Sequence, residues 1–231
     1  MRFLAVAPLL CMFLGIGLSS IGIIPPIAGF GLFAFSGLLA LIASLLIFFT
    51  KVRKGLLNFR ILVVIAAAPL FVVLISAASG LAYPPINDIT TDIENPPPFV
   101  QALESNPGRD MAYPEDFKSI VQEKYADLEP LLLEESAERV YQRALKLAEA
   151  QSGWTVTNDD PATMSIEGEA QSYFFRFIDD FVIRVSDSDG GARVDMRSKS
   201  RDGKGDLGAN AKRIQSFFEK LSAEPSEDVS E

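Results

Sequence analysis

The sequence predicts three transmembrane α-helices followed by an α+β two-layer domain. Uncharged apolar runs fill the first third, and alternating apolar residues flanked by helical patterns fill the last third. The composition agrees, because 48% of the 231 residues are hydrophobic and 22% are charged. The charge divides at the same place: residues 1–82 hold five basic residues and no acidic one, which leaves 83–231 with a net charge of −14.

The membrane part is predicted from three runs that contain no charged residue, at 3–24, 27–49 and 61–82. Each meets the roughly 20 residues that a helix needs to cross a hydrocarbon core of about 30 Å. A cleavable signal peptide is the alternative for the first run, but that run is longer than the roughly 7–15 apolar residues typical of such peptides. We therefore predict that residues 1–82 form a membrane anchor with a lipid bilayer as partner.

The basic residues of the anchor predict its orientation. One short connection carries four of them without an acidic residue: Lys51, Arg53, Lys54 and Arg60. Loops rich in Lys and Arg stay on the cytoplasmic side of a membrane. We expect a multi-pass protein of a bacterial inner (plasma) membrane, with its N-terminus in the cytoplasm and its C-terminal domain periplasmic or extracellular.

The residues inside the helices predict packing rather than transport. A charge at membrane depth costs at least about 2.5–3.5 kcal/mol and is kept for function, and the three runs hold none. Small residues four positions apart let helices approach closely, and two such series are present: Gly15 with Ser19, and Ser36 with Ala40 and Ser44. We interpret both as contacts among the three helices, with self-association or a partner helix as the alternative.

Residues 83–133 are predicted to be a proline-rich extended linker that packs on the folded domain. Eight prolines exclude a long uninterrupted helix, although one short helix fits at 114–125. The apolar side chains of this segment are too many to leave in water: Ile86, Ile89, Phe99, Val100, Phe117, Ile120 and Tyr125.

Residues 134–222 are predicted to form the α+β domain, followed by a disordered acidic tail at 223–231. Helical spacing after Ser136 ends near Gly153, and a second apolar stripe runs from Leu207 to Leu221. Between them the period changes to two, which predicts about four antiparallel strands. The alternating groups are 154–156, 164–166, 173–177, 181–185 and 194–196. Two helices then cover one face of the sheet.

Residues 193–213 form a basic segment, with seven basic and three acidic residues inside an acidic domain. Arginine binds phosphate or carboxylate with two hydrogen bonds, glycines let backbone N–H groups approach a ligand, and a helix N-terminus attracts anions. We predict that an anionic ligand contacts Arg197, Ser198, Ser200, Arg201, Gly203, Asp206, Gly208, Asn210 and Arg213. The alternative is structural: Asp206 caps a helix and the arginines pair with nearby carboxylates.

The composition also limits the chemistry. The chain has no histidine, and its single cysteine, Cys11, lies in an apolar run. This excludes histidine-based catalytic triads, His or Cys metal sites and an internal disulfide. We assign no catalytic residue, metal or cofactor, and the acidic charge disfavours nucleic acid. A hydrolase that uses Ser198 or Ser200 with Lys199 or Lys204 is the weaker alternative.

The run at 197–214 resembles the signature of the family catalogued as domain of unknown function 1499. The matching residues are Arg197, Ser198, Ser200, Arg201, Gly203, Asp206, Leu207, Gly208, Asn210, Arg213 and Ile214. Weaker similarity at 179–181 and 85–92 extends the resemblance to roughly 84–222. The resemblance implies a membrane-associated or envelope domain, and it implies no reaction.

We therefore predict an integral membrane protein whose extracytoplasmic domain is a binding or interaction module. Its expected partner is an anionic small molecule, a lipid head group or another envelope protein. A membrane-anchored hydrolase that uses the 197–210 loop and a structural subunit of a membrane complex are the alternatives.

Overall fold

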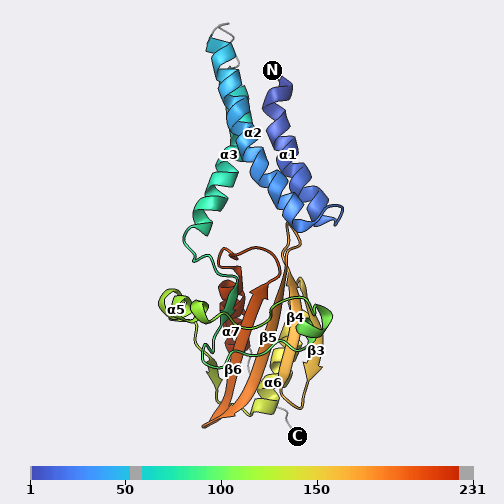
Figure 1. The fold of residues 1–231 in the computed structure, drawn as a ribbon, viewed down its shortest axis with the longest axis vertical. Coiled ribbons are helices and arrows are strands. Elements are labelled where there is room, and N and C mark those ends of the chain that lie inside the picture. The colour runs from blue at the N-terminus through green and yellow to red at the C-terminus, as the bar shows by residue number, and fades with distance from the viewer. Residues whose placement is uncertain (1, 53–58, 224–231) are drawn as a thin grey trace. The chain divides into compact units, whose positions relative to one another are not determined.

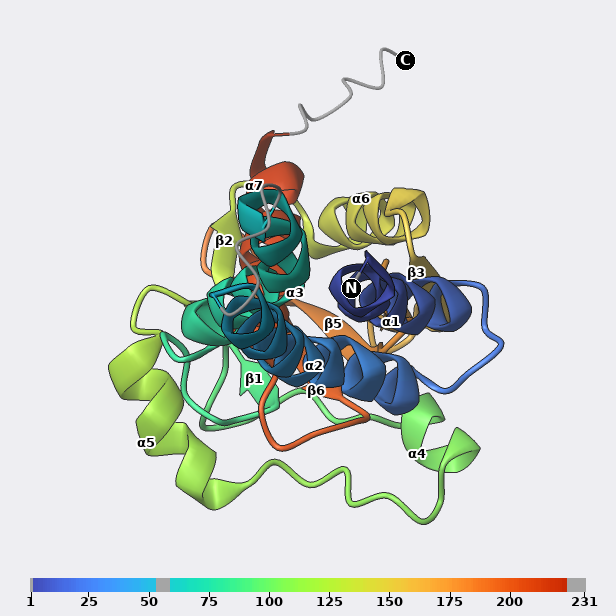
Figure 2. The same ribbon diagram turned by 90° about the horizontal axis from the view of Figure 1, so that it is seen from above.

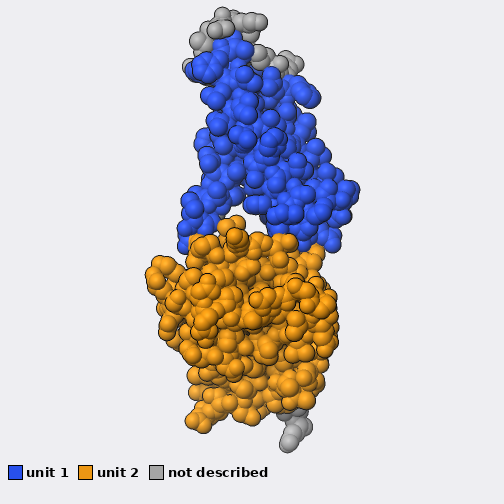
Figure 3. All heavy atoms as spheres, in the orientation of Figure 1, with its two compact units in different colours: residues 1–82, 172–177 blue, residues 83–171, 178–231 orange. Residues whose placement is uncertain are grey.

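A computed structural model of the chain describes residues 2–52 and 59–223. It divides into two compact units, one of residues 1–82 with 172–177 and one of residues 83–171 with 178–231 (Figure 3). The centre of the predicted basic connection, residues 53–58, and the acidic tail at 224–231 lie outside the described residues.

The first unit contains the three predicted helices, α1 (Arg2–Ser20), α2 (Pro26–Val52) and α3 (Phe59–Gly80). Each holds a stretch long and apolar enough to cross a membrane: Phe3–Ser20, Pro26–Thr50 and Ile61–Ala78. Most of the large apolar side chains on these helices are exposed, as lipid-facing side chains are. Helix α1 ends earlier than predicted, because the chain turns at Gly22, whose φ of +76° favours glycine.

Close packing of α1 on α2 depends on small residues. A Cβ atom added at Gly15 would lie 2.7 Å from the carbonyl oxygen of Gly29, and one added at Gly29 would lie 2.4 Å from Cβ of Ser19. Ser36 and Ala40 on α2 are fully buried. The predicted small-residue contacts between helices are therefore present, and a larger side chain at the α1–α2 crossing would separate the two backbones.

The second unit is built on a six-stranded sheet with the order β1-β6-β5-β4-β3, and β2 also pairs with β6 (Figure 1). Every pairing is antiparallel. The strands are β1 (Asp88–Thr90), β2 (Leu131–Leu133), β3 (Trp154–Asp160), β4 (Ser165–Gln171), β5 (Ile178–Ser188) and β6 (Gly191–Ser200). The four longer strands were predicted, whereas β1 and β2 come from the segment that was expected to be an extended linker.

Two helices cover one face of this sheet, α6 (Ala137–Ala150) and α7 (Ala209–Ala223) (Figure 2). The side chain of Ser136 accepts a hydrogen bond from the backbone N–H of Arg139 and so caps α6. In the core, the Trp154 ring lies 4.4 Å from Phe181 and 5.6 Å from Phe217, centroid to centroid. The predicted α+β architecture with two helices on one sheet face is confirmed.

The opposite face is covered by the chain that follows β1, including the short helix α4 (Gln101–Ser105). Phe99, Ala102 and Met111 form an apolar cluster with Val182 of β5. A second helix, α5 (Glu115–Lys124), falls within the range predicted for one. Two of the basic side chains of β6 on this face are therefore less open to solvent than the alternating pattern alone suggested: Arg197 is 3% and Lys199 12% exposed, whereas Arg193 is 37% exposed.

The prediction of a strand at 173–177 was wrong. This segment joins β4 to β5 and packs within the first unit. The Phe175 ring lies 5.6 Å from Phe30 and 5.7 Å from Phe33 of α2, and Ser19 Oγ donates to the Phe175 carbonyl at 2.9 Å. The alternating aromatic pattern reflects contact of Phe175 and Phe177 with α2 rather than the pleat of a strand.

Candidate functional site

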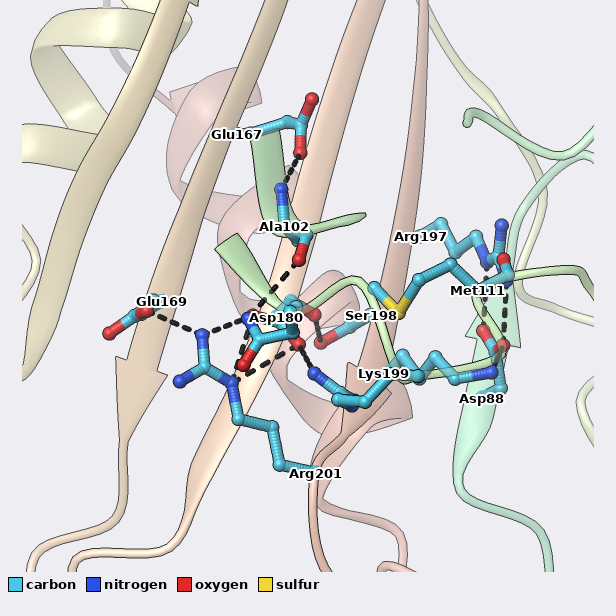
Figure 4. Close-up of polar contacts among 12 residues, drawn as sticks. Asp88, Ala102, Met111, Glu167, Glu169, Asp180, Arg197, Ser198, Lys199 and Arg201 are labelled. Carbon is cyan, nitrogen blue, oxygen red and sulfur yellow. Dashed lines mark hydrogen bonds and ion pairs between the residues drawn. The ribbon is translucent and has the colours of Figure 1, made fainter. Parts of the chain in front are cut away.

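The covered sheet face carries a network of ion pairs (Figure 4). Residues of a strand alternate between its faces, so one set of side chains on β6 points away from the helices, together with their cross-strand neighbours. The ion-paired residues are Asp88, Asp92, Glu169, Asp180, Arg184, Arg193, Asp195, Arg197, Lys199 and Arg201. Figure 4 shows Asp88, Glu169, Asp180, Arg197, Lys199 and Arg201.

Arg197 is the most buried cation among these ion pairs and is paired with Asp88 by two hydrogen bonds. Nε donates to Oδ1 at 2.9 Å and Nη2 to Oδ2 at 2.8 Å, and the two side chains are 3% and 0% exposed. Lys199 Nζ lies 2.9 Å from the same carboxylate. Asp88 thus faces two cations, which leaves one positive charge in excess at this point.

Two aromatic rings hold the Arg197 guanidinium in place. Its Cζ lies 4.7 Å from the centroid of Phe99 and 5.3 Å from that of Tyr113. The same group donates to the carbonyl oxygens of Pro97 at 3.3 Å and Met111 at 2.9 Å. Arg197 therefore ties the covering segment to the sheet through hydrogen bonds and cation–π contacts.

Arg201 is paired in a similar way with Asp180. Nη2 lies 2.6 Å from Oδ1, the other oxygen accepts from Arg109 Nη1 at 2.5 Å, and Arg201 also pairs with Glu169. Burial alone would lower the pKa of Arg201, but hydrogen bonds to Asp180 and Glu169 raise it above its usual value. The guanidinium is therefore charged and its charge is neutralised by carboxylates.

A second pair of arginines, Arg184 and Arg193, shares Asp92 and Asp195. Arg184 Nη2 lies 3.0 Å from Asp92 and 3.1 Å from Asp195, and Arg193 Nη2 lies 3.2 Å and 3.0 Å from the same two residues. The hydrogen bond to Asp195 raises the pKa of Arg193, and burial opposes it. These four side chains form a closed charge-balanced group.

Glu167, on β4, fixes the covering segment in another way. Its buried carboxylate accepts backbone N–H groups of Val100 at 2.8 Å, Gln101 at 3.1 Å and Ala102 at 3.2 Å. These donors lie at the beginning of α4, where backbone N–H groups have no partner within the helix. The carboxylate thus satisfies them and attaches α4 to the sheet.

Ser198, Ser200, Asn210 and Arg213 lie on the other face, between β6 and α7. Ser198 Oγ donates to Asn210 Oδ1 at 2.7 Å, Asn210 Nδ2 donates to Ser200 Oγ at 3.0 Å, and Arg213 Nη1 donates to Ser198 Oγ at 2.8 Å. Arg213 Nη2 is also 2.5 Å from Asp179. This cluster joins the last strand to the last helix.

Asp206, Gly203 and Gly208 form the turn between them. The Asp206 carboxylate accepts the backbone N–H of Gly208 at 2.9 Å and of Asn210 at 2.8 Å, as a capping residue does. Burial raises the pKa of Asp206, and these hydrogen bonds oppose the shift. Gly203 and Gly208 have φ values of +84° and +78°, in the region that favours glycine.

The nine predicted ligand residues are therefore divided between two sheet faces and the connecting turn. Arg197 and Arg201 lie on one face and are paired with carboxylates, while Ser198 and Asn210 are fully buried on the other. The contacts of each group are those expected for the structural alternative. A hydrolytic role for Ser198 gains no support, because its hydroxyl is inaccessible and Lys199 is held by Asp88.

Sequence reasoning missed a hollow on the covered face. It has a volume of about 500 Å³ and is lined by Pro96, Phe99, Arg109, Met111, Tyr113 and Arg197, among others. Within the described part of the chain, the buried Tyr113 hydroxyl has no hydrogen-bond partner. Burial raises the pKa of Tyr113, as does the nearby Asp88 carboxylate, while Arg197 opposes them. The hydroxyl therefore stays protonated and can act as a donor.

The sequence contained one indication of the residues that line the hollow: the predicted linker at 83–133 is too apolar to remain in water. The described residues, 2–52 and 59–223, contain no group of three or more His, Cys, Asp or Glu side chains that would hold a metal ion. The site consists of a charge network that holds the covering segment in place, with an aromatic hollow beside Arg197.

Comparison with family models gives a match over most of the second unit and the loop at 172–177. The model described as "Protein of unknown function (DUF1499)" matches residues 88–221. No curated protein matches the chain. The match begins at Asp88, the partner of Arg197, and ends at Leu221 in α7, so it includes the whole sheet and both polar clusters. Because it covers more than half of the chain, the protein belongs to the DUF1499 family.

Proposed function

We propose that this is a multi-pass protein of a bacterial inner membrane whose second unit acts outside the cytoplasm as a non-catalytic ligand-binding module. Three helices that are long and apolar enough to span a membrane support the anchor. The sidedness rests on the charge pattern: a basic connection between the second and third spans, and an acidic sequence after the third.

The observation that carries the binding proposal is the hollow beside Arg197 with the unpartnered Tyr113 hydroxyl. A buried polar group without a partner costs about 1–3 kcal/mol, which a ligand acceptor would recover. Arg197 has five N–H groups, and its hydrogen bonds use four, so one on Nη1 also has no partner within the described residues. Tyr113 and Arg197 both line the hollow, so in this proposal a ligand bound there accepts hydrogen bonds from these two groups.

The surroundings of these donors indicate the class of ligand. Phe99, Met111 and neighbouring prolines make the walls apolar, and Asp88 is shared by two cations, which leaves local positive charge. A compact molecule with an apolar body and a carboxylate or phosphoryl oxygen fits this combination. In this proposal Arg197 contacts the ligand, while Arg201, Ser198, Asn210 and Arg213 maintain the fold.

The binding proposal is tested with the full chain in lipid nanodiscs and two fluorinated probes observed by ¹⁹F NMR. 4-Fluorobenzoate carries an apolar ring and a carboxylate, and 4-fluorobenzylamine carries the opposite charge on a similar body. We expect the benzoate to bind and the amine not to bind. A hydrogen bond to a charged partner contributes about 1.5–3 kcal/mol, so Tyr113→Phe should weaken benzoate binding at least about 10-fold.

Tyr125→Phe is the matched control, because the Tyr125 hydroxyl is also buried without a partner in the described structure but does not line the hollow. It should leave benzoate binding unchanged. Equal binding of both probes, or equal loss in both tyrosine variants, would show that the signal comes from partition into lipid or from a general effect on the fold, and would reject the site.

The sidedness is tested separately by fusing alkaline phosphatase after Val100. The fusion should be active in bacterial cells, because this enzyme folds only where disulfides form. An inactive fusion, with a fluorescent cytoplasmic reporter active at the same position, would reject the extracytoplasmic location and leave the result of the probe experiment standing.

A further inference from the structure

The loop at 172–177 carries four aromatic side chains that divide into two pairs. Phe175 and Phe177 contact Phe30 of α2, with centroid distances of 5.6 and 6.1 Å. Tyr173 and Phe174 are 88% and 59% exposed. Large aromatic side chains with this exposure are uncommon on the water-facing surface of a protein unless the surface contacts a partner.

The conformation of the loop is set by its own hydrogen bonds. The backbone N–H of Phe177 donates to Ser172 Oγ at 2.9 Å, and that of Arg176 donates to the Ser172 carbonyl at 3.0 Å. Arg176 has a φ of +60°, an uncommon value for a residue other than glycine. Ser19 Oγ attaches the loop to α1 through the Phe175 carbonyl at 2.9 Å. The outward direction of Tyr173 and Phe174 is therefore built into a closed turn.

The position of the loop along the helices gives its depth in a bilayer. The second candidate span is Pro26–Thr50, and the ring contacts are at Phe30 and Phe33. With a rise of 1.5 Å per residue, these side chains lie about 6 and 10 Å inside the end of the span. Ile21, Ile23 and Ile27, around the same turn, are also exposed. In a bilayer crossed by this span, the loop would pack on the helix surface near the boundary between head groups and acyl chains.

We infer that residues 172–177 form an interfacial membrane anchor, in which Tyr173 and Phe174 insert among the lipid head groups of the leaflet that contains the α1–α2 turn. Tyrosine and tryptophan are enriched at this level, because a ring with an apolar body and a polar edge suits the boundary. Lipid is the partner because the inner pair of rings already packs on membrane-spanning helices. This surface is separate from the hollow beside Arg197.

The test uses tryptophan fluorescence of the full chain in vesicles of phosphatidylcholine brominated at shallow or deep acyl positions. Trp154 is the only tryptophan, so Trp154→Phe provides the background, and Phe174→Trp places the probe in the loop. We expect blue-shifted emission that shallow bromines quench more than deep ones. Tyr173→Trp gives an independent reading, and circular dichroism checks that each variant is folded.

Two controls bracket the result. Phe35, a half-exposed residue of α2, lies about 14 Å inside the span, so Phe35→Trp should be quenched more by deep bromines. Leu132→Trp, at an exposed position of β2 in the second unit, should emit at long wavelength without quenching. The inference is overturned if folded tryptophan variants at 173 and 174 show the long-wavelength, unquenched emission of the Leu132→Trp control. That result would mean that water, a second copy of the chain or another protein covers the loop instead of lipid.

Discussion

Replacing Asp88 by asparagine should strongly destabilise the second unit. The change keeps the shape of the side chain and removes the one negative charge that faces both Arg197 and Lys199. Lys199 is 12% exposed and can turn towards water, whereas Arg197 is 3% exposed and enclosed by Phe99 and Tyr113. Removing one partner of a buried ion pair costs about 3–5 kcal/mol, and we expect Asp88→Asn to lower the free energy of unfolding by this amount.

The assay is urea unfolding of the full chain in mild detergent, followed by the fluorescence of Trp154. This residue reports on the second unit because it packs against Phe181 and Phe217 in the core. Glu115→Gln is the matched control: Glu115 pairs with Lys118 at 3.0 Å but is 83% exposed. Exposed pairs contribute about 0–1 kcal/mol, so this variant should unfold close to the wild type.

A double variant separates the charge effect from a general effect on packing. Asp88→Asn combined with Arg197→Met removes both charges, so it should be more stable than Asp88→Asn alone, although the carbonyls of Pro97 and Met111 lose their donor. If Asp88→Asn cost no more than Glu115→Gln, or if the double variant were the less stable of the two, the buried network would not hold the covering segment as described.

Two further predictions concern the turn before α7. Gly203→Ala and Gly208→Ala both place alanine at positive φ, which costs about 1–2 kcal/mol. Only the second adds a Cβ 2.5 Å from the Tyr83 ring. Gly208→Ala should therefore lose about 1–3 kcal/mol more than Gly203→Ala in the same urea assay, and equal losses would reject the close contact. The pKa of Asp206 is raised above its usual 3.8, so the folded state binds the carboxyl proton more tightly than the unfolded state does. This proton binding stabilises the folded state fully below pH 3.8. The stabilisation is lost as the pH rises through the folded-state pKa. The free energy of unfolding of the wild type minus that of Asp206→Asn should accordingly fall from pH 4 towards neutrality, and a difference that rises with pH would contradict the assignment.

The features that the sequence predicted well are those that depend on local pattern. The three uncharged apolar runs predicted the membrane helices. The change in the spacing of apolar residues, from about 3.6 to 2, located α6, α7 and the four longer strands. Strands β1 and β2 have three residues each, which is too short for a period to be recognised. The alternating aromatic residues at 173–177 led to a wrong strand prediction. Phe175 and Phe177 are two residues apart, as in a strand, because both contact α2.

The candidate site was harder to predict, because its partners are distant in the sequence. The excess of basic residues at 193–213 suggested an open anion site, yet Arg197 is neutralised by Asp88 from another part of the chain. The capping role of Asp206 follows from local sequence and was named as an alternative. The hollow beside Tyr113 depends on how the proline-rich segment crosses the sheet. The course of an irregular segment cannot be predicted from the spacing of its apolar residues.

The distance in sequence between Asp88 and Arg197, 109 residues, has a consequence for synthesis. A ribosome adds about 5–20 residues per second, so roughly 5–20 s pass after Asp88 is made before its counter-charge exists. Strand β1 and the crossing segment cannot dock during this interval, since the central strands that receive them are still missing. The aromatic and proline-rich residues of the crossing segment must therefore stay uncovered until β5 and β6 have been made, and this is the period in which a chaperone would be of most use to the nascent chain.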